Sequence, residues 1–165
     1  MQIRQERPED ASTIRALTDA AFKGMPFSDQ TEAQVIDALR AAGALTVSLV
    51  AVEGDEIIGH VAFSPVKING AVGDWYGLGP VSVWPDRQRT GVGQALIREG
   101  LQRLQSRSAG GCVLLGDPAY YRRFGFESDP DLHYPDAPPG AFQHLTLKGP
   151  RPSGAVRFHP AFDVS

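Results

Sequence analysis

The sequence predicts a mixed α/β protein built around one sheet, and two kinds of signal carry this prediction. Hairpin turns are indicated at EGDE (residues 53–56) and at Asn69-Gly70. A strand–helix–strand crossover is indicated between residues 76 and 116. Hairpins join antiparallel strands and crossovers join parallel strands, so we expect both kinds of pairing in the same sheet.

A short strand and two helices are expected at the start of the chain. Residues 2–7 alternate weakly between polar and apolar, and Pro8 suits the first turn of a helix. Asp29 and Glu32 have the spacing of a capping box at the start of the second helix. The apolar face of the first helix is formed by Ile14, Leu17 and Ala21, and that of the second by Val35, Ile36 and Leu39.

Three strands are expected next, over residues 45–53, 56–66 and 76–85. The first two are rich in β-branched and apolar residues. The third begins with YGLGP, whose glycines and proline are poor residues for the middle of a regular ladder. We therefore expect a bulge or a splayed strand there.

The second half of the chain is expected to alternate helices with short strands. A helix begins near Gly91, residues 110–116 form a buried strand, and residues 118–124 form a short helix. Residues 141–147 are the last long strand, and residues 155–162 a further short strand or a docked tail. The apolar side of the longer helix is formed by Val92, Leu96, Ile97, Leu101 and Leu104.

Composition narrows the class of protein. At 165 residues we expect one domain over residues 1–165, large enough to bury a core. The net charge of -3 argues against a nucleic-acid binder. The single cysteine, Cys112, cannot form an internal disulfide, and no Cys/His spacing indicates zinc. With no signal-peptide pattern and no run long enough to span a bilayer, we expect a cytoplasmic protein without membrane contact.

Gly91 and Gly93 stand at the start of a predicted helix, where glycine is a poor helix former. The first N–H groups of a helix lack intrahelical partners and attract anions, and glycines let a phosphate come close. Arg89 adds a charged contact. The P-loop pattern fails, because no Lys-Ser/Thr follows Gly93, and the dinucleotide fingerprint fails, because Leu96 stands at its third glycine.

The string QRTGVGQAL (88–96) resembles the Gln/Arg-x-x-Gly-x-Gly/Ala motif with which the GCN5-related N-acetyltransferases (GNAT) bind acyl-CoA. It follows LGPVSVWP, with glycine and proline where that family splays two strands apart. The string GDPAYYRRFGFE (116–127) is similar to the family's Tyr-x-x-x-Gly-Phe segment and resembles the YhbS-like branch of predicted acetyltransferases. The resemblance covers nearly the whole chain and is weakest over residues 127–165, the C-terminal strands and acceptor-side region.

The resemblance implies a mostly antiparallel, V-split sheet flanked by helices. It implies transfer of an acetyl group from acetyl-CoA to a primary amine by direct attack in a ternary complex, with no metal. Tyr121 is implied as the general acid that protonates the departing thiolate. Tyr120, which is out of register with the family pattern, is its competitor. Backbone groups of Val81, Ser82 and Val83 would hold the pantetheine arm, and Arg89, Thr90, Gly91, Val92, Gly93 and Gln94 would wrap the pyrophosphate.

The sequence departs from the family pattern at the general base. Several members of the family have a glutamate on the splayed strand, whereas residues 76–83 contain no carboxylate. An ordered water, Glu32, Asp117 and His60 stay open as candidates, although Asp117 before Pro118 also fits an N-cap.

The resemblance implies a small-molecule or peptide amine as the acceptor, without indicating which one. Four apolar side chains fit either an acceptor pocket or core packing: Phe22, Met25, Phe27 and Phe142. An acyl-CoA-binding sensor without turnover, another acyl-CoA and a non-amine acceptor stay as alternatives, and a homodimer is left open.

Overall fold

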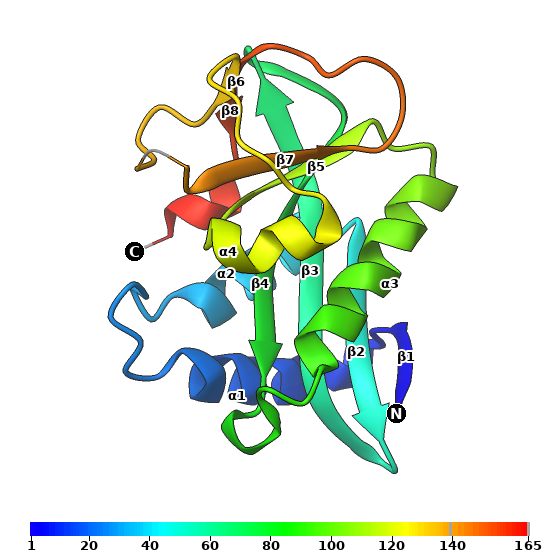
Figure 1. Ribbon diagram of the computed structural model, residues 1–165. Coiled ribbons are helices and arrows are strands. Elements are labelled where there is room, and N and C mark those ends of the chain that lie inside the picture. Colours follow the sequence, from blue (N-terminus) through cyan, green and yellow to red (C-terminus); the bar gives the residue numbers. More distant parts are fainter. Residues whose placement is uncertain (139, 165) are drawn as a thin grey trace.

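The computed structural model describes residues 1–138 and 140–164. One mixed sheet crosses the molecule in the order β1-β2-β3-β4-β5-β7, with β8 attached to β3 and β6 to β8 (Figure 1). Among these pairs only β4–β5 and β6–β8 are parallel, so the mostly antiparallel sheet is confirmed. The strands are β1 Gln2–Gln5, β2 Val47–Glu53, β3 Glu56–Ile68, β4 Ala71–Val83, β5 Gly111–Leu115, β6 Leu132–His133, β7 Phe142–Thr146 and β8 Gly154–Arg157.

Helices cover both faces of the sheet (Figure 1). The side chains of β2 alternate between them: Val50 packs with α1 and α2, whereas Leu49 and Ala51 pack with α3. The helices are α1 Ala11–Phe22, α2 Glu32–Ala41, α3 Val92–Ser106 and the short α4 Pro118–Tyr121. Within the described residues, no helix is both long and apolar enough to cross a membrane.

Two glycines let α3 lie close to the sheet. A Cβ at Gly100 of α3 would occupy the position of the Phe63 ring on β3. A Cβ at Gly59 of β3 would lie 2.9 Å from Cγ1 of Val92, the first residue of α3. Close packing at the first residue and in the middle of the helix therefore fixes where its N-terminus stands relative to β3 and β4.

The strand that carries the glycines and proline behaves as the sequence predicts. Val61 pairs with Val81 and Phe63 with Leu78, so β4 has one extra residue between these pairs, which is a bulge. On its other edge β4 pairs with β5 only over residues 75–77. Beyond that point β4 and β5 separate, which confirms the splayed strand.

Two local predictions need correction, and one short strand was not predicted. The second helix has Thr31 rather than Asp29 as its N-cap, and Glu32 accepts hydrogen bonds from the Ser28 hydroxyl instead of closing a capping box. The strand expected from residue 76 begins at Ala71, because the Asn-Gly turn leads directly into it. The two-residue strand β6 was not expected, since so short a segment carries no periodic signal.

A polar cluster is buried where β1, β2, β3 and α2 meet. The Ser48 hydroxyl donates to the Glu6 carboxylate, and Arg40 Nε donates to it at 2.8 Å. Burial lowers the pKa of His60 and favours its neutral ring. Because the Ser48 hydrogen goes to Glu6, His60 Nε2 is the donor in its 2.8 Å contact with Ser48 Oγ. Burial opposes ionisation of Glu6, but its contacts with His60, Arg40 and Ser48 outweigh burial and lower its pKa to about 2.

The substitution Glu6→Gln should lower the free energy of unfolding near neutral pH. The gap between the unfolded pKa of 4.5 and the folded pKa of about 2 is worth about 3 kcal/mol. Because the folded pKa is the lower one, this stability is complete above the unfolded pKa and is lost as the pH falls toward the folded pKa. Urea unfolding of both proteins should therefore show a difference at neutral pH that shrinks in acid.

The matched control is Glu9→Gln, which changes an exposed carboxylate on the same segment. It should leave the free energy of unfolding unchanged. A difference between wild type and Glu6→Gln that stays constant from neutral pH into acid would contradict the assigned pKa.

Candidate functional site

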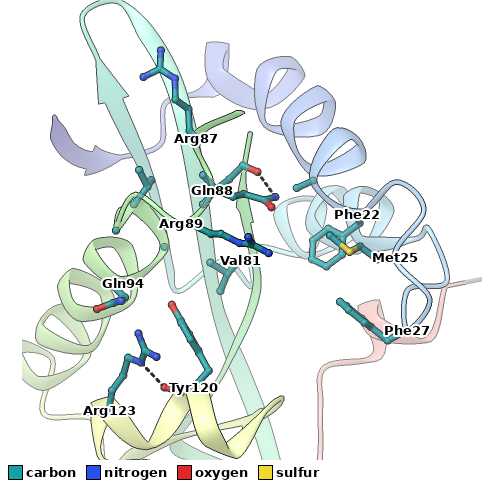
Figure 2. Close-up of a pocket in the computed structure, with 15 residues that line it drawn as sticks. Phe22, Met25, Phe27, Val81, Arg87, Gln88, Arg89, Gln94, Tyr120 and Arg123 are labelled. Carbon is teal, nitrogen blue, oxygen red and sulfur yellow. Dashed lines mark hydrogen bonds between the residues drawn. The ribbon is translucent and has the colours of Figure 1, made fainter. Parts of the chain in front are cut away.

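A cavity of about 470 Å³ opens beside the end of β4, where the chain leaves the sheet and enters α3. Its walls come from the end of α1 with the following turn, the second half of β4, the start of α3, and α4 (Figure 2). Seven of the predicted cofactor residues line it: Val81, Val83, Arg89, Gly91, Val92, Gly93 and Gln94.

The loop from β4 to α3 turns the first turn of the helix toward this cavity. Arg89 and Gly91 take left-handed backbone, with φ of 66° and 91°, and Gly91 is the N-cap of α3. The first intrahelical bond runs from Ala95 N–H to Gly91 O at 3.0 Å. The three preceding N–H groups therefore lack helical acceptors, and with the positive end of the helix dipole they suit an anion.

Gly93 leaves room that no protein atom fills. A Cβ built there would meet Tyr120 Oη at 3.8 Å and Val83 Cγ2 at 3.9 Å, which are ordinary contacts. Neither backbone strain nor packing inside the protein requires glycine at this position. The missing side chain instead keeps the first turn of α3 open toward the cavity.

The second half of β4 offers an open backbone edge. Trp84 N–H donates to Ile58 O in the register of the β3–β4 ladder. Hydrogen-bonded pairs alternate along an antiparallel ladder, so Val81 and Val83 direct their backbone groups away from β3. Since β5 pairs with β4 only over residues 75–77, no strand of the described residues covers that edge at Val81 and Val83, although the Val83 carbonyl accepts a hydrogen bond from the Gln88 side chain.

Two predicted cofactor residues do not line the cavity. Ser82 is buried on the opposite face, where its hydroxyl donates to Thr18 Oγ1 at 3.3 Å. Thr90 is exposed, and its hydroxyl donates to the carbonyl of Arg87. Both side chains are therefore engaged elsewhere. It stays a prediction that these two residues contact a cofactor, and such contacts would be made by their backbone groups.

Three arginines line the cavity, but they differ in their partners. Arg87 forms an ion pair with Glu53 of β2. Arg89 and Arg123 have no carboxylate within ion-pair distance in residues 1–138 and 140–164. The guanidinium of Arg123 lies 4.3 Å from the centre of the Tyr120 ring, and its Nε donates to Tyr120 O at 2.8 Å (Figure 2).

Tyr120 and Tyr121 point to different places. Tyr120 lines the cavity near Gly93. Tyr121 does not line it; its ring packs on the end of β5, where a Cβ at Gly116 would lie 2.5 Å from Tyr121 Cε2. Burial raises the pKa of Tyr121 to about 12 and also raises the pKa of Tyr120, so both phenols stay protonated near neutral pH.

None of the three side chains named as candidate bases lines the cavity. His60 is fully buried in the cluster around Glu6. Glu32 accepts hydrogen bonds from Ser28. Asp117 is the N-cap of α4 and accepts a hydrogen bond from Ala119 N–H at 2.9 Å, which confirms the capping alternative. In the described part of the chain, no group of three His, Cys, Asp or Glu residues is arranged to hold a metal ion.

The four apolar candidates for an acceptor pocket separate into two sets. Phe22, Met25 and Phe27 line the cavity on the side of α1. Phe142 is instead buried in a cluster with Trp75 of β4 and other core residues. Of the four residues, core packing therefore accounts only for Phe142.

Sequence reasoning left Arg87, Gln88 and Arg123 without a role in the cavity, and it named Tyr120 only as the competitor for the general acid. Gln88 Nε2 donates to Val83 O at 3.1 Å, and it is the first residue of the glycine motif, a signal that was available. Tyr120 and Arg123 form the wall from α4 and the following turn. Their position next to Tyr121 was visible in the sequence, but which neighbour faces the cavity depends on how α4 packs.

Known proteins match both the sequence and the fold. A family model described as "Acetyltransferase (GNAT) domain" matches residues 2–128. The uncharacterized N-acetyltransferase YhbS of Escherichia coli strain K12 is 41% identical over 128 residues, which is 77% of this chain and 74% of YhbS.

Two crystal structures match nearly the whole chain. A GNAT family acetyltransferase from Brucella melitensis, in complex with acetyl-CoA, is 53% identical with a TM-score of 0.89, over 98% of this chain and 97% of that one. YhbS from Escherichia coli, in complex with CoA, is 35% identical with a TM-score of 0.86, over 99% of this chain and 92% of that one. From the family model and these relatives, the chain belongs to the GNAT family of acetyltransferases.

Proposed function

We propose that the protein transfers the acetyl group of acetyl-CoA to a primary amine by direct attack in a ternary complex. The observation that carries the proposal is the meeting, in one cavity, of the glycine turn of α3 and the open edge of β4. The relative from Brucella melitensis, crystallised with acetyl-CoA, supports the choice of acyl donor.

The cavity suggests how acetyl-CoA would lie. The pyrophosphate binds the N–H groups of Gly91 to Gln94, with Arg89 beside them. Gly93 is close to Val83, so the pantetheine arm starts at Val83 and continues past Val81, pairing with the open edge like an extra strand. The thioester then lies toward the point where β4 and β5 separate.

Tyr121 is the proposed general acid. Its ring packs on the end of β5, beyond the point where the two strands part, whereas the Tyr120 hydroxyl lies near Gly93 at the phosphate end. The amine nitrogen attacks the carbonyl carbon, the carbon–sulfur bond breaks, and the phenol gives its proton to the departing thiolate. A pKa of about 12 keeps that proton available.

An ordered water is the proposed base for the amine proton. The described lining of the cavity contains no carboxylate or imidazole, and the side chains of Glu32, Asp117 and His60 are engaged elsewhere. Positioning of the two substrates then supplies most of the rate enhancement.

We propose that residues 1–165 act as one domain, since β8 pairs with β3 at Lys67 and Ile68 and so joins the C-terminal region to the main sheet. A cytoplasmic location stays a prediction, which the single cysteine, Cys112, free and buried, supports together with the N-terminal sequence.

Release of the CoA thiol, measured with a panel of amines, tests the function. Release that depends on both acetyl-CoA and an amine is expected. If the protein binds acetyl-CoA but releases no thiol with any acceptor, the transferase proposal fails and the alternative of an acyl-CoA sensor is favoured. If the CoA thiol is released only with hydroxyl acceptors, the acceptor is an alcohol rather than an amine.

Gly93→Leu should weaken acetyl-CoA binding by about 100-fold, because the side chain fills the space at the first turn of α3. Gly93→Ala is the matched control: its Cβ makes only ordinary contacts, and the family motif accepts alanine at this position. Titration calorimetry gives the affinities, and thermal unfolding checks the folds. If Gly93→Leu and wild type bind acetyl-CoA with equal affinity, the pyrophosphate does not bind at this turn.

Tyr121→Phe should lower kcat by about 100-fold, with acetyl-CoA affinity unchanged, because the phenol proton is lost while the ring is kept. Tyr120→Phe keeps the ring beneath Arg123 and should change kcat only slightly. Steady-state thiol release of both variants decides between the tyrosines. If Tyr120→Phe causes the larger loss, the general acid is Tyr120.

A further inference from the structure

One wall of the cavity is apolar and stands apart from the core. We call it the aromatic wall: Phe22 at the end of α1, and Met25 and Phe27 in the following turn, all on the same side of the cavity (Figure 2). Phe27 is 77% exposed. None of the three belongs to the hydrophobic clusters of the described residues. Core packing therefore does not explain them.

Hydrogen bonds hold the turn that carries the aromatic wall. Met25 N–H donates to Phe22 O at 3.1 Å, and Ser28 N–H donates to Met25 O at 3.1 Å. The Gln30 side chain donates to Phe22 O at 2.7 Å, and the Ser28 hydroxyl donates to Glu32 of α2. The wall is thus preformed, and a ligand that covers it does not have to order the turn first.

The charge of the cavity restricts what can bind there. Among the described residues that line it there is no Asp or Glu, whereas three arginines are present. An acceptor with several ammonium groups, such as a polyamine or an aminoglycoside, would bring positive charge to a cavity without carboxylates. Such charges bind poorly unless they are paired.

We propose that the acceptor is a monoamine with an apolar body, and that this body packs on the aromatic wall. The inference rests on the proposed function and deepens it by naming the acceptor class. The glycine turn and the open edge of β4 take the phosphates and the pantetheine arm, which leaves the wall on the side of α1 to the second substrate. Covering Phe27 removes apolar surface from water and so favours an apolar partner.

The first experiment compares three amines as acceptors in the thiol-release assay. For 2-phenylethylamine we expect kcat/KM to exceed that for ethylamine by about tenfold, because the phenyl group gains a contact that ethylamine lacks. Spermidine should be poorer than 2-phenylethylamine. Equal or higher kcat/KM for spermidine would overturn the acceptor class while leaving the transferase function in place. No release with any amine, in a protein that binds acetyl-CoA, would overturn both.

The second experiment uses Phe27→Ser, with Val72→Ser as the matched control. Both residues are exposed, at 77% and 63%, so neither change disturbs the core, and Val72 lies on β4 outside the cavity lining. Phe27→Ser should raise KM for 2-phenylethylamine by about tenfold, a larger effect than on KM for ethylamine, which lacks the phenyl contact, with the Kd of acetyl-CoA unchanged. Val72→Ser should change none of these. A weaker Kd for acetyl-CoA in Phe27→Ser, or an unchanged KM for 2-phenylethylamine, would overturn the assignment of the wall to the acceptor.

Discussion

The separation of β4 from β5 is the constraint on which the site depends. The two strands share only the pairs at residues 75–77 and 111–113, after which β5 continues beside β7 while β4 stays with β3. In the part of the chain that the structure describes, Val81 and Val83 keep backbone groups that no strand takes up. Such an edge is a template for pairing with any extended chain that carries amides. The separation thus creates the surface along which an amide-containing arm can bind.

The same region fixes where negative charge can bind. The chain leaves β4 after Val83 and enters α3 at Val92, so the helix begins beside the open edge. Gly59 and Gly100 allow α3 to pack closely on β3, with Val92 and Phe63 in the space that a Cβ would need. The helix N-terminus that suits an anion and the open backbone edge are therefore adjacent, because one short loop joins them. This adjacency suits a ligand that is charged at one end and extended at the other.

The sequence predicted the parts of this site that local patterns control. Gly91, Gly93 and the glycine-proline step of β4 are local signals: the two glycines indicated the open first turn of α3, and the glycine-proline step indicated the bulge. Contacts between residues that are distant in the sequence could not be predicted from local patterns. Whether Arg87 is available depends on Glu53, which lies 34 residues away on β2, and whether Tyr120 or Tyr121 faces the cavity depends on how α4 packs.

Two features of the cavity favour the neutral form of a bound amine. The described lining has no carboxylate, and the aromatic wall is apolar. A neighbouring carboxylate would stabilise the ammonium form, in which the nitrogen has no free lone pair and cannot attack the thioester. Apolar surroundings disfavour the charged form, so they lower the pKa of an amine that binds there. The arginines of the cavity add to this effect, because positive charge also disfavours ammonium. In the proposed reaction, a wall that selects an apolar acceptor would therefore also deliver it in the neutral, nucleophilic form, and water is then sufficient to remove the proton after attack.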